Sequence, residues 1–293
     1  MALITVITPT YNRAEQLKKL FQSLSSQTSN NFEWLVVDDG STDHTAEAAN
    51  EMMQSANFRM RYIHKENGGK HTALNAGIKT ITSELTFIVD SDDDVLPDGI
   101  ATIERYYLKY KDEPDVGIWA FLRQSRSKGI ILKMPHDEYV GDYAEERIRK
   151  NRPGDLAEVF LTKALREFPF PEFQGERFLS EDVVWIPLGQ KYRSVFINLP
   201  IYLCDYLQGG LTHNDKILKF ASPLGSMLRG KMLMRKECGF KAKIRGAIIY
   251  DCYRREVRTP IPESVELEKI SDKIMVAFLH PAGAWFNRRW RKD

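Results

Sequence analysis

The chain has 293 residues, of which 43% are hydrophobic and 28% charged, and this composition excludes a disordered chain, a collagen-like repeat and a small disulfide scaffold. No apolar run approaches the roughly 20 residues that span a bilayer, which disfavours an integral membrane protein. The three cysteines lack metal-type spacing and indicate thiols in a reducing compartment. Because Leu3 begins an apolar run without a basic leader, we expect no signal peptide and a cytoplasmic protein.

The net charge of +2 conceals an asymmetry along the chain. Residues 1–215 carry 24 Lys and Arg against 32 Asp and Glu, whereas residues 216–293 carry 18 against 8. A net charge of −8 is therefore followed by one of +10. The basic C-terminal quarter predicts contact with an anionic partner.

The first 123 residues alternate between strand and helix patterns. Apolar runs predict strands at residues 3–8, 32–37, 60–64, 85–89 and 116–122. Helical periodicity separates these runs, as in Leu17, Leu20, Phe21 and Leu24. Asn12 and Glu15 resemble a capping box, and Pro97 suits the first turn of a later helix. Repeated strand–helix units predict an α/β fold with a Rossmann-like, mainly parallel sheet flanked by helices.

Beyond residue 123 the pattern weakens. Residues 124–158 are charged and predict loops, residues 194–199 predict another strand, and residues 216–293 predict a basic helical segment.

Polar clusters follow four of the predicted strands, at residues 9–12, 38–39, 67–71 and 90–94. Ligands of parallel sheets bind beyond the carboxyl ends of the strands, so we expect these clusters to share one edge. No G-x-G-x-x-G follows the first strand and no G-x-x-x-x-G-K-[ST] occurs, which disfavours a dinucleotide-binding fold and a P-loop.

Three acidic segments carry the candidate chemistry. Asp90 and Asp92 are hard oxygen donors suited to Mg²⁺ or Mn²⁺, although an acidic loop at a helix start is the alternative. One Asp of the 38–39 turn fits the imino N–H of a pyrimidine with Tyr11 stacked on the base, or the turn merely caps a helix. Asp182 fits a general base, or belongs to an exposed acidic pair.

Taken together, five segments resemble glycosyltransferase family 2, a large inverting family with the GT-A fold. They are Ile7–Arg13, Val36–Asp43, Asn67–Gly77, Val89–Pro97 and Glu181-Asp182. The resemblance covers about residues 1–210, and the first four segments are specific as an ordered set, whereas Glu181-Asp182 is a less specific match.

The resemblance implies transfer of a hexosyl or N-acetylhexosaminyl group, with inversion, from a UDP-linked donor to a saccharide or lipid-linked saccharide acceptor. It implies nucleotide binding by Pro9, Thr10, Tyr11, Asp39, Lys70 and Asp90. It implies Mn²⁺ or Mg²⁺ at Asp92 and Asp90, with His213 within reach of the metal or diphosphate, and Asp182 as the base. The adjacent Asp93 and Asp94 leave the choice of metal ligands open by one position.

The resemblance also implies a domain arrangement and a cellular role. A GT-A domain covers residues 1–215, with a nucleotide-sugar half to about residue 123 and an acceptor half at about 124–215. A basic helical extension covers residues 216–293. The role implied is bacterial surface polysaccharide or glycolipid assembly.

Aromatic and basic residues alternate at the C-terminus, namely Trp285, Phe286, Arg288, Arg289, Trp290 and Arg291. This pattern predicts a peripheral contact of residues 284–293 with the inner face of the plasma membrane. The alternative is that these aromatic rings pack on the body of the protein.

Two other classes compete with the glycosyltransferase. A nucleotidyltransferase also uses paired carboxylates, but residues 9–13 lack its Gly-rich basic phosphate loop. A non-enzymatic nucleotide- or anion-binding module is the second alternative. Nucleic acid is not an expected partner, because its phosphates repel the carboxylates at the strand ends.

Overall fold

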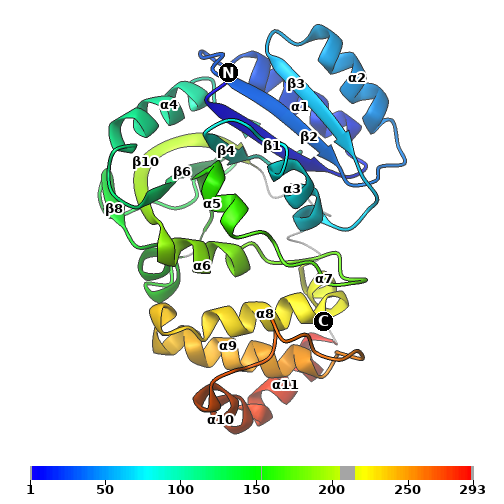
Figure 1. The fold of residues 1–293 in the computed structure, drawn as a ribbon, viewed down its shortest axis with the longest axis vertical. Helices are drawn as coiled ribbons and strands as arrows, with labels where there is room; N and C mark the ends of the chain where they lie inside the picture. The colour runs from blue at the N-terminus through cyan, green and yellow to red at the C-terminus, as the bar shows by residue number, and fades with distance from the viewer. Residues whose placement is uncertain (1, 153, 205–214, 292–293) are drawn as a thin grey trace. The chain divides into compact units, whose positions relative to one another are not determined.

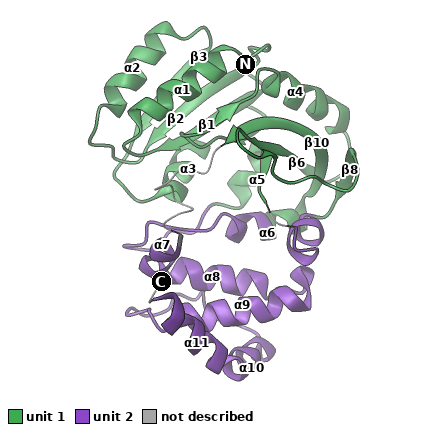
Figure 2. Ribbon diagram, turned by 180° about the vertical axis from the view of Figure 1, so that it is seen from behind, with its two compact units in different colours: residues 1–142, 153–169, 188–205 green, residues 143–152, 170–187, 206–293 purple. Residues whose placement is uncertain are grey.

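The computed structural model describes residues 2–152, 154–204 and 215–291 (Figure 1). The chain divides into two compact units (Figure 2). Unit 1 comprises residues 1–142, 153–169 and 188–205, and unit 2 comprises residues 143–152, 170–187 and 206–293. Unit 2 thus joins two earlier segments to the C-terminal helices, and the domain boundary expected at residue 215 stays a prediction.

A ten-stranded sheet forms the centre of the described part of unit 1. Its main path runs β3-β2-β1-β4-β9-β6-β10-β5, with β7 paired to β6 and β8 paired to β10. The strands are β1 (Ile4–Thr10), β2 (Phe32–Asp38), β3 (Arg59–His64), β4 (Leu85–Ile88), β5 (Asp94–Val95), β6 (Val116–Ser125), β7 (Gly129–Ile130), β8 (Glu138–Gly141), β9 (Leu156–Leu161) and β10 (Arg193–Cys204).

The first four strands are parallel and confirm the apolar runs of the sequence. β1 pairs with β2 from Ile4 opposite Phe32 to Thr10 opposite Asp38, and with β4 on its other side. Every residue of β1, β2 and β4 is buried, as expected of strands covered on both faces. This register brings the carboxyl ends of the strands to one edge. Helices connect the strands, namely α1 (Ala14–Ser25), α2 (Thr45–Ser55), α3 (Lys70–Ile78), α4 (Gly99–Tyr110) and α5 (Thr162–Glu167).

The expectation of loops over residues 124–158 is wrong. β6 continues to Ser125, β7 and β8 follow, and a short helix η1 (Ala144–Arg149) precedes β9. β9 lies between β4 and β6 and is antiparallel to both. Its six residues are too few to establish a period, and its partners lie far away in the sequence.

Two expected helix starts are also wrong. α1 begins at Ala14, so its N-cap is Arg13 and not Asn12, which has a positive φ of 51° and does not form the capping box. The Asn12 Oδ1 instead accepts hydrogen bonds from the backbone N–H of Thr42 at 2.7 Å and of Asp43 at 3.3 Å. Pro97 precedes α4, which begins at Gly99. The Pro97 carbonyl accepts the N–H of Thr28 at 3.0 Å, and this hydrogen bond joins the loop before α4 to the loop between α1 and β2.

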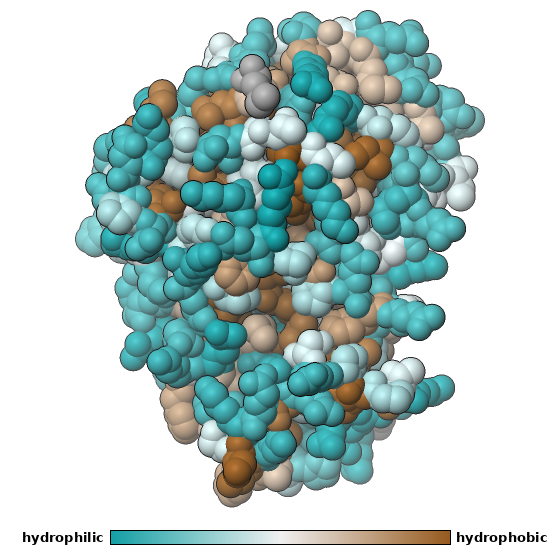
Figure 3. Space-filling model, viewed as in Figure 1, coloured by the Kyte–Doolittle hydropathy of each residue, from teal (hydrophilic) through white to brown (hydrophobic). Residues whose placement is uncertain are grey.

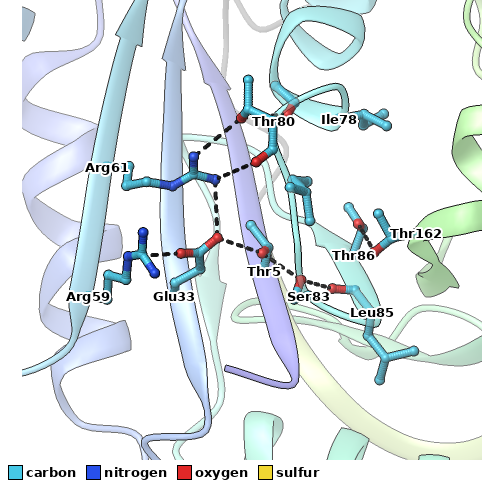
Figure 4. Close-up of polar contacts among 12 residues, drawn as sticks. Thr5, Glu33, Arg59, Arg61, Ile78, Thr80, Ser83, Leu85, Thr86 and Thr162 are labelled. Atoms are coloured by element: carbon cyan, nitrogen blue, oxygen red, sulfur yellow. Dashed lines mark hydrogen bonds and ion pairs between the residues drawn. The ribbon is translucent and has the colours of Figure 1, made fainter. Parts of the chain in front are cut away.

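A closed polar network lies near the amino ends of β1, β2 and β3 (Figure 4). Glu33, only 3% exposed, accepts hydrogen bonds through Oε1 from Thr5 Oγ1 at 3.0 Å and from Arg61 at 3.1 Å. Its Oε2 lies 3.3 Å from Arg59 Nε. Thr5 in turn shares a 2.7 Å hydrogen bond with Ser83. The buried charge therefore has protein partners on both oxygens.

In the described part of unit 2 the regular elements are all helices, which confirms the C-terminal helices. Its elements are η1, the start of α6 (Asp182–Lys191), α7 (Asp215–Ala221), α8 (Pro223–Leu233), η2 (Lys236–Cys238), α9 (Gly239–Arg254), α10 (Ile270–Phe278) and α11 (His280–Trp290). α8 and α9 meet at Gly230 and Gly246, where a Cβ on Gly230 would lie 2.7 Å from the Gly246 carbonyl oxygen. The Glu176 carboxylate accepts the N–H groups of Leu224 at 2.7 Å and Gly225 at 2.8 Å, and so caps α8. Within the described residues, none of the helices is long and apolar enough to cross a membrane.

Candidate active site

Three of the predicted nucleotide-binding residues end β1 or follow it. Pro9 and Thr10 are buried, whereas Tyr11 is 46% exposed and available for stacking. Thr10 accepts the backbone N–H of Asp39 through its carbonyl at 2.9 Å, which joins the ends of β1 and β2. The Thr10 hydroxyl, on a residue 3% exposed, has no hydrogen-bond partner among the described residues. Such an orphaned hydroxyl has unused hydrogen-bonding capacity for a ligand.

Asp39, predicted to bind the nucleotide, anchors the loop before α3. Its Oδ1 accepts Lys65 Nζ at 2.8 Å and the Gly68 N–H at 3.0 Å, and its Oδ2 accepts the Gly69 N–H at 2.6 Å. Its own carbonyl accepts Asn67 Nδ2 at 2.8 Å. Thr72 Oγ1 also lies 3.5 Å from Oδ1. A carboxylate offers about four acceptor positions, so these four donors occupy them, and the Thr72 contact is the longest of the four. The sequence assigned no role to Lys65.

The neighbouring Asp38 is completely buried at the end of β2. Its Oδ1 accepts the Ser41 N–H at 2.8 Å and its Oδ2 accepts the Tyr62 hydroxyl at 2.5 Å. Burial, and then the hydrogen bond to Asp38, raise the pKa of Tyr62 above its usual value. Asp38 therefore fixes the turn that presents Asp39.

Asp90, at the end of β4, faces Lys70, the first residue of α3. Their Nζ and Oδ1 atoms are 2.5 Å apart, and both side chains are between one quarter and one third exposed. Burial opposes ionisation of Asp90, but the charges of Lys70, Arg123 and Arg13 outweigh it and lower its pKa. Asp90 is accordingly held as a carboxylate.

Asp92 faces Arg13, which lies between β1 and α1. Arg13 Nη1 and Asp92 Oδ2 are 2.5 Å apart, and the side chains are 25% and 20% exposed. The sequence included Arg13 in a family motif without giving it a role. A partly exposed ion pair at this position leaves the Asp92 carboxylate accessible to another cation.

Asp93 forms a hydrogen bond with a residue of β10. Its Oδ2 accepts the Tyr202 hydroxyl at 2.8 Å, and that same hydroxyl oxygen accepts the Asp90 N–H at 3.0 Å. The Arg123 guanidinium lies 4.3 Å from the Tyr202 ring centre. Burial, and then the charge of Asp90, raise the pKa of Asp93 to about 7. The sequence missed Tyr202 and Arg123, because only the sheet topology brings β6 and β10 beside residues 90–94.

Asp90 and Asp92, at the carboxyl edge of the sheet, suit a divalent metal that also binds substrate phosphates. Within the described part of the chain, no group of three or more His, Cys, Asp or Glu side chains forms a metal site. Mg²⁺ commonly uses one or two carboxylates and completes its shell with water and substrate phosphates. Asp90 and Asp92 provide two such carboxylates on one turn, so the donor set fits. His213, the remaining predicted ligand, lies outside the described residues.

Asp182 belongs to unit 2, whereas the nucleotide residues described above belong to unit 1. It begins α6, and its Oδ2 accepts a hydrogen bond from Arg229 Nε of α8 at 2.7 Å. Its Oδ1 has no hydrogen-bond partner among the described residues. The ion pair orients the carboxylate and leaves one oxygen for a proton. No sequence pattern linked Arg229 to Asp182.

Comparison with proteins of known structure identifies the fold. The chain resembles Staphylococcus aureus TarS 1–349 in complex with UDP, with a TM-score of 0.64 and 16% identity over 99% of this chain and 88% of that one. It also resembles the mannosyltransferase PcManGT of Pyrobaculum calidifontis in complex with GDP-Man and Mn²⁺, with a TM-score of 0.59 and 18% identity over 99% and 88% of the chains. The expected GT-A fold is therefore confirmed.

Sequence comparison identifies the family. The glycosyltransferase GlyG of Streptococcus pneumoniae serotype 4 is 30% identical over 242 residues, which are 78% of this chain and 79% of GlyG. GlyA of the same organism is 27% identical over 202 residues, which are 68% of this chain and 28% of GlyA. The family model described as glycosyl transferase family 2 matches residues 5–168. The chain belongs to glycosyltransferase family 2 and is a glycosyltransferase, which decides against the nucleotidyltransferase and the non-enzymatic module.

Proposed function

We propose that this enzyme transfers a hexosyl or N-acetylhexosaminyl group from a UDP-sugar to an acceptor hydroxyl, with inversion and with the help of Mn²⁺ or Mg²⁺. The observation that carries the proposal is the pairing of Asp90 with Lys70 and of Asp92 with Arg13 at the carboxyl edge of the sheet. Both carboxylates lie against partly exposed cationic side chains, so a metal can replace these cations while Lys70 and Arg13 bind the donor phosphates.

Different residues at the carboxyl edge of the sheet are proposed to bind different parts of the donor. Tyr11 provides an exposed ring for the base, and the Thr10 hydroxyl provides a polar contact. Asp39 is proposed to accept the imino N–H of the base in place of its longest contact, the one from Thr72 at 3.5 Å. Asp92 and Asp90 would hold the metal. Asp92 would be the direct ligand, because the charges of Lys70, Arg123 and Arg13 already act on Asp90, whereas Asp92 forms an ion pair with Arg13. When bound, the metal neutralises charge on the departing diphosphate. TarS with UDP-GlcNAc and PcManGT with GDP-Man and Mn²⁺ support this assignment by their shared fold.

Asp182 is the proposed general base. The Arg229 hydrogen bond holds its Oδ2, and its Oδ1 accepts the proton of the acceptor hydroxyl as that oxygen attacks the anomeric carbon. The glycosidic bond to the acceptor forms as the bond to the nucleoside diphosphate breaks. The proposed domains are residues 1–215 for transfer and 216–293 for the basic extension.

The donor is tested by measuring nucleotide release from UDP-, GDP- and dTDP-sugars with Mn²⁺ or Mg²⁺. We expect one UDP-sugar to be hydrolysed slowly, and we expect EDTA or Asp92→Asn to abolish the release. Asp98→Asn is the matched control, because Asp98 is an exposed acidic residue of the same loop. A rate that is insensitive to EDTA and equal in the two variants would contradict the proposed metal site.

The base is tested with Asp182→Asn. Loss of a general base lowers kcat by about 10²–10⁴-fold. Calorimetric titration with UDP and Mn²⁺ should give the same Kd in the variant and the wild type, because the donor residues belong to unit 1. A variant that keeps full kcat in the presence of a working acceptor would exclude Asp182 as the base.

We further propose peripheral contact with the inner face of the plasma membrane in surface polysaccharide or glycolipid assembly, now centred on α10. Trp290 packs against Tyr253 and Phe286, and Trp285 is 51% exposed. Three large apolar residues at helical spacing on α10 are much more exposed, namely Ile270 (74%), Ile274 (63%) and Phe278 (82%). Apolar side chains are visible at the surface where α10 lies (Figure 3). An apolar stripe in a segment of net charge +10 suits an anionic membrane.

Sedimentation with phosphatidylglycerol vesicles tests this contact. Ile274→Glu should reduce the bound fraction about tenfold or more, because it places a carboxylate in the apolar stripe. Leu108→Glu is the matched control, since Leu108 is 55% exposed on α4 of unit 1. Equal binding by the two variants would contradict a contact through α10.

A further inference from the structure

A buried tyrosine contacts the turn that carries the proposed metal ligands. Residues 90–93 form a β-turn, which is closed by a 3.2 Å hydrogen bond from the Asp93 N–H to the Asp90 carbonyl. Asp90 is the first residue of this turn and Asp92 is the third. The positions of both carboxylates therefore depend on the shape of the turn. Tyr202 of β10, which is completely buried, contacts both ends of it.

The Tyr202 hydroxyl holds the two ends of the turn together. It donates its proton to Asp93 Oδ2 at 2.8 Å and accepts the Asp90 N–H at 3.0 Å. A hydroxyl has one proton to donate and two lone pairs with which to accept, so one oxygen can make both contacts. We propose that Tyr202 is a positioning residue for the metal, and that its hydroxyl keeps the turn in the shape in which Asp90 and Asp92 bind a divalent cation. The metal site itself is that of the proposed function, on which this inference rests.

The Tyr202 ring is held in place by side chains of two other strands. Arg123 of β6 lies opposite Tyr202 in the sheet register, and its guanidinium is 4.3 Å from the ring centre. Arg123 Nε donates to the Leu156 carbonyl at 2.8 Å, which fixes the guanidinium against β9. Phe87 of β4 meets the Tyr202 ring edge-on, with 6.1 Å between the ring centres. The hydroxyl therefore has a fixed position before any ligand binds.

The backbone of β10 also holds the chain that leaves the turn. Tyr202 pairs with Val95 of β5, and the Leu96 N–H donates to the Ile201 carbonyl at 2.9 Å. These contacts use backbone atoms, so Tyr202→Phe keeps them and keeps the aromatic ring. The substitution removes only the hydroxyl, and its effect should be confined to the turn.

Loss of a side chain that orients metal ligands typically lowers metal affinity by about 10–100-fold. The proposed contacts to the base come from Tyr11, Thr10 and Asp39, at the ends of β1 and β2, and do not involve Tyr202. Tyr202→Phe should therefore weaken the metal-dependent part of UDP binding and leave the metal-independent part unchanged. A general loss of structure would weaken both parts together.

Calorimetric titration with UDP at a series of Mn²⁺ concentrations, and in EDTA, separates the two parts. In Tyr202→Phe, the Mn²⁺ concentration that gives half of the gain in UDP affinity should rise about 10–100-fold. The Kd for UDP in EDTA should equal that of the wild type. Tyr192→Phe is the matched control, because Tyr192 is also buried in unit 1 and its hydroxyl donates to the Glu167 carboxylate at 3.0 Å. This control should match the wild type in both measurements.

Hydrogen exchange measured by NMR tests the turn without metal or nucleotide. The Asp90 amide should exchange about fivefold or more faster in Tyr202→Phe than in the wild type, because it loses its acceptor. In Tyr192→Phe the exchange rate of this amide should stay at the wild-type value.

Unchanged exchange of the Asp90 amide, or the same Mn²⁺ dependence in the two tyrosine variants, would overturn the inference. Weaker UDP binding by Tyr202→Phe in EDTA would overturn it as well, since Tyr202 would then support the fold and not the metal site. Failure of the proposed function gives a different result, namely UDP binding by the wild type that does not depend on Mn²⁺. That result would overturn the metal site and this inference together, whereas Mn²⁺-dependent binding that Tyr202→Phe leaves intact would overturn this inference alone.

Discussion

The two ends of the parallel part of the sheet hold carboxylates in contrasting surroundings, with Glu33 near the start of β2 and Asp90, Asp92 and Asp93 after β4. At the amino end, Glu33 accepts hydrogen bonds from Thr5 and Arg61 and pairs with Arg59 (Figure 4). At the carboxyl end, Asp90 and Asp92 share one turn with Asp93, whose pKa burial and then the Asp90 charge raise to about 7. At the amino end a single carboxylate has protein partners on both oxygens. At the carboxyl end three neighbouring carboxylates share a few cationic side chains, among them Lys70 and Arg13.

The partners and the pKa of a buried carboxylate therefore help to distinguish a structural carboxylate from one in a functional site. A buried carboxylate with protein donors on both oxygens contributes to folding, and removal of a partner leaves an uncompensated charge. A carboxylate whose pKa is raised by burial and by a neighbouring carboxylate, as that of Asp93 is by Asp90, marks a candidate functional site. Burial alone does not distinguish the two, because Glu33 and Asp93 are 3% and 8% exposed.

The largest effect should come from Glu33→Gln at the amino end. The amide oxygen of the variant still accepts hydrogen bonds, but Arg61 and Arg59 lose their buried counter-charge. We expect the free energy of unfolding to fall by about 3–5 kcal/mol. Urea denaturation measures this change. If the variant is as stable as the wild type, the amino-end network does not stabilise the fold and the contrast between the two ends fails.

The carboxyl end should instead show a dependence of stability on pH. The folded pKa of Asp93 is raised to about 7 from 3.8, so the folded state binds a proton more tightly than the unfolded state. The resulting stabilisation is complete below pH 3.8 and is lost as the pH rises to about 7, by up to about 4 kcal/mol. Denaturation in EDTA at several pH values measures it. Asp93→Asn should flatten the profile relative to Asp98→Asn, and identical profiles would refute the assignment.

The smallest changes in the free energy of unfolding should come from substitutions of Arg61 and Arg59 at the amino end. Arg61 is 27% exposed and hydrogen-bonds Glu33, so Arg61→Gln should lower the free energy of unfolding by about 1–3 kcal/mol. Arg59 is 67% exposed, so Arg59→Gln should cost less than about 1 kcal/mol. Thermal unfolding of the two variants compares them, and the reverse order would show that the inner ion pair is not the stronger one.

Apolar patterns predicted the elements whose burial is continuous along the chain. β1, β2 and β4 are buried on both faces, so their sequences alone indicate strands, and their ends locate the polar clusters of the site. β9 was missed because its antiparallel partners, β4 and β6, become neighbours only through the topology of the sheet.

Local motifs likewise predicted the acidic residues of the site but not the side chains that hold them. The Lys65 contact with Asp39 spans 26 positions and the Arg229 contact with Asp182 spans 47. The Tyr202 hydroxyl reaches Asp93 from 109 positions away. Such distant contacts leave no periodic signal, because only folding brings the residues together. The positive φ of Asn12 was missed for a related reason, since its hydrogen bonds to the 42–43 backbone replace a helix cap.

The central claim is that the carboxyl end of the sheet performs the chemistry and the amino end does not. The most direct test compares kcat/KM of Asp92→Asn and Glu33→Gln for release of UDP from the preferred UDP-sugar, at a temperature where both variants are folded. Loss of a metal ligand should cost several kcal/mol, so we expect a fall of about 100-fold or more in Asp92→Asn. Glu33→Gln should keep kcat/KM near the wild-type value. Equal losses in the two variants, or a loss confined to Glu33→Gln, would contradict the account.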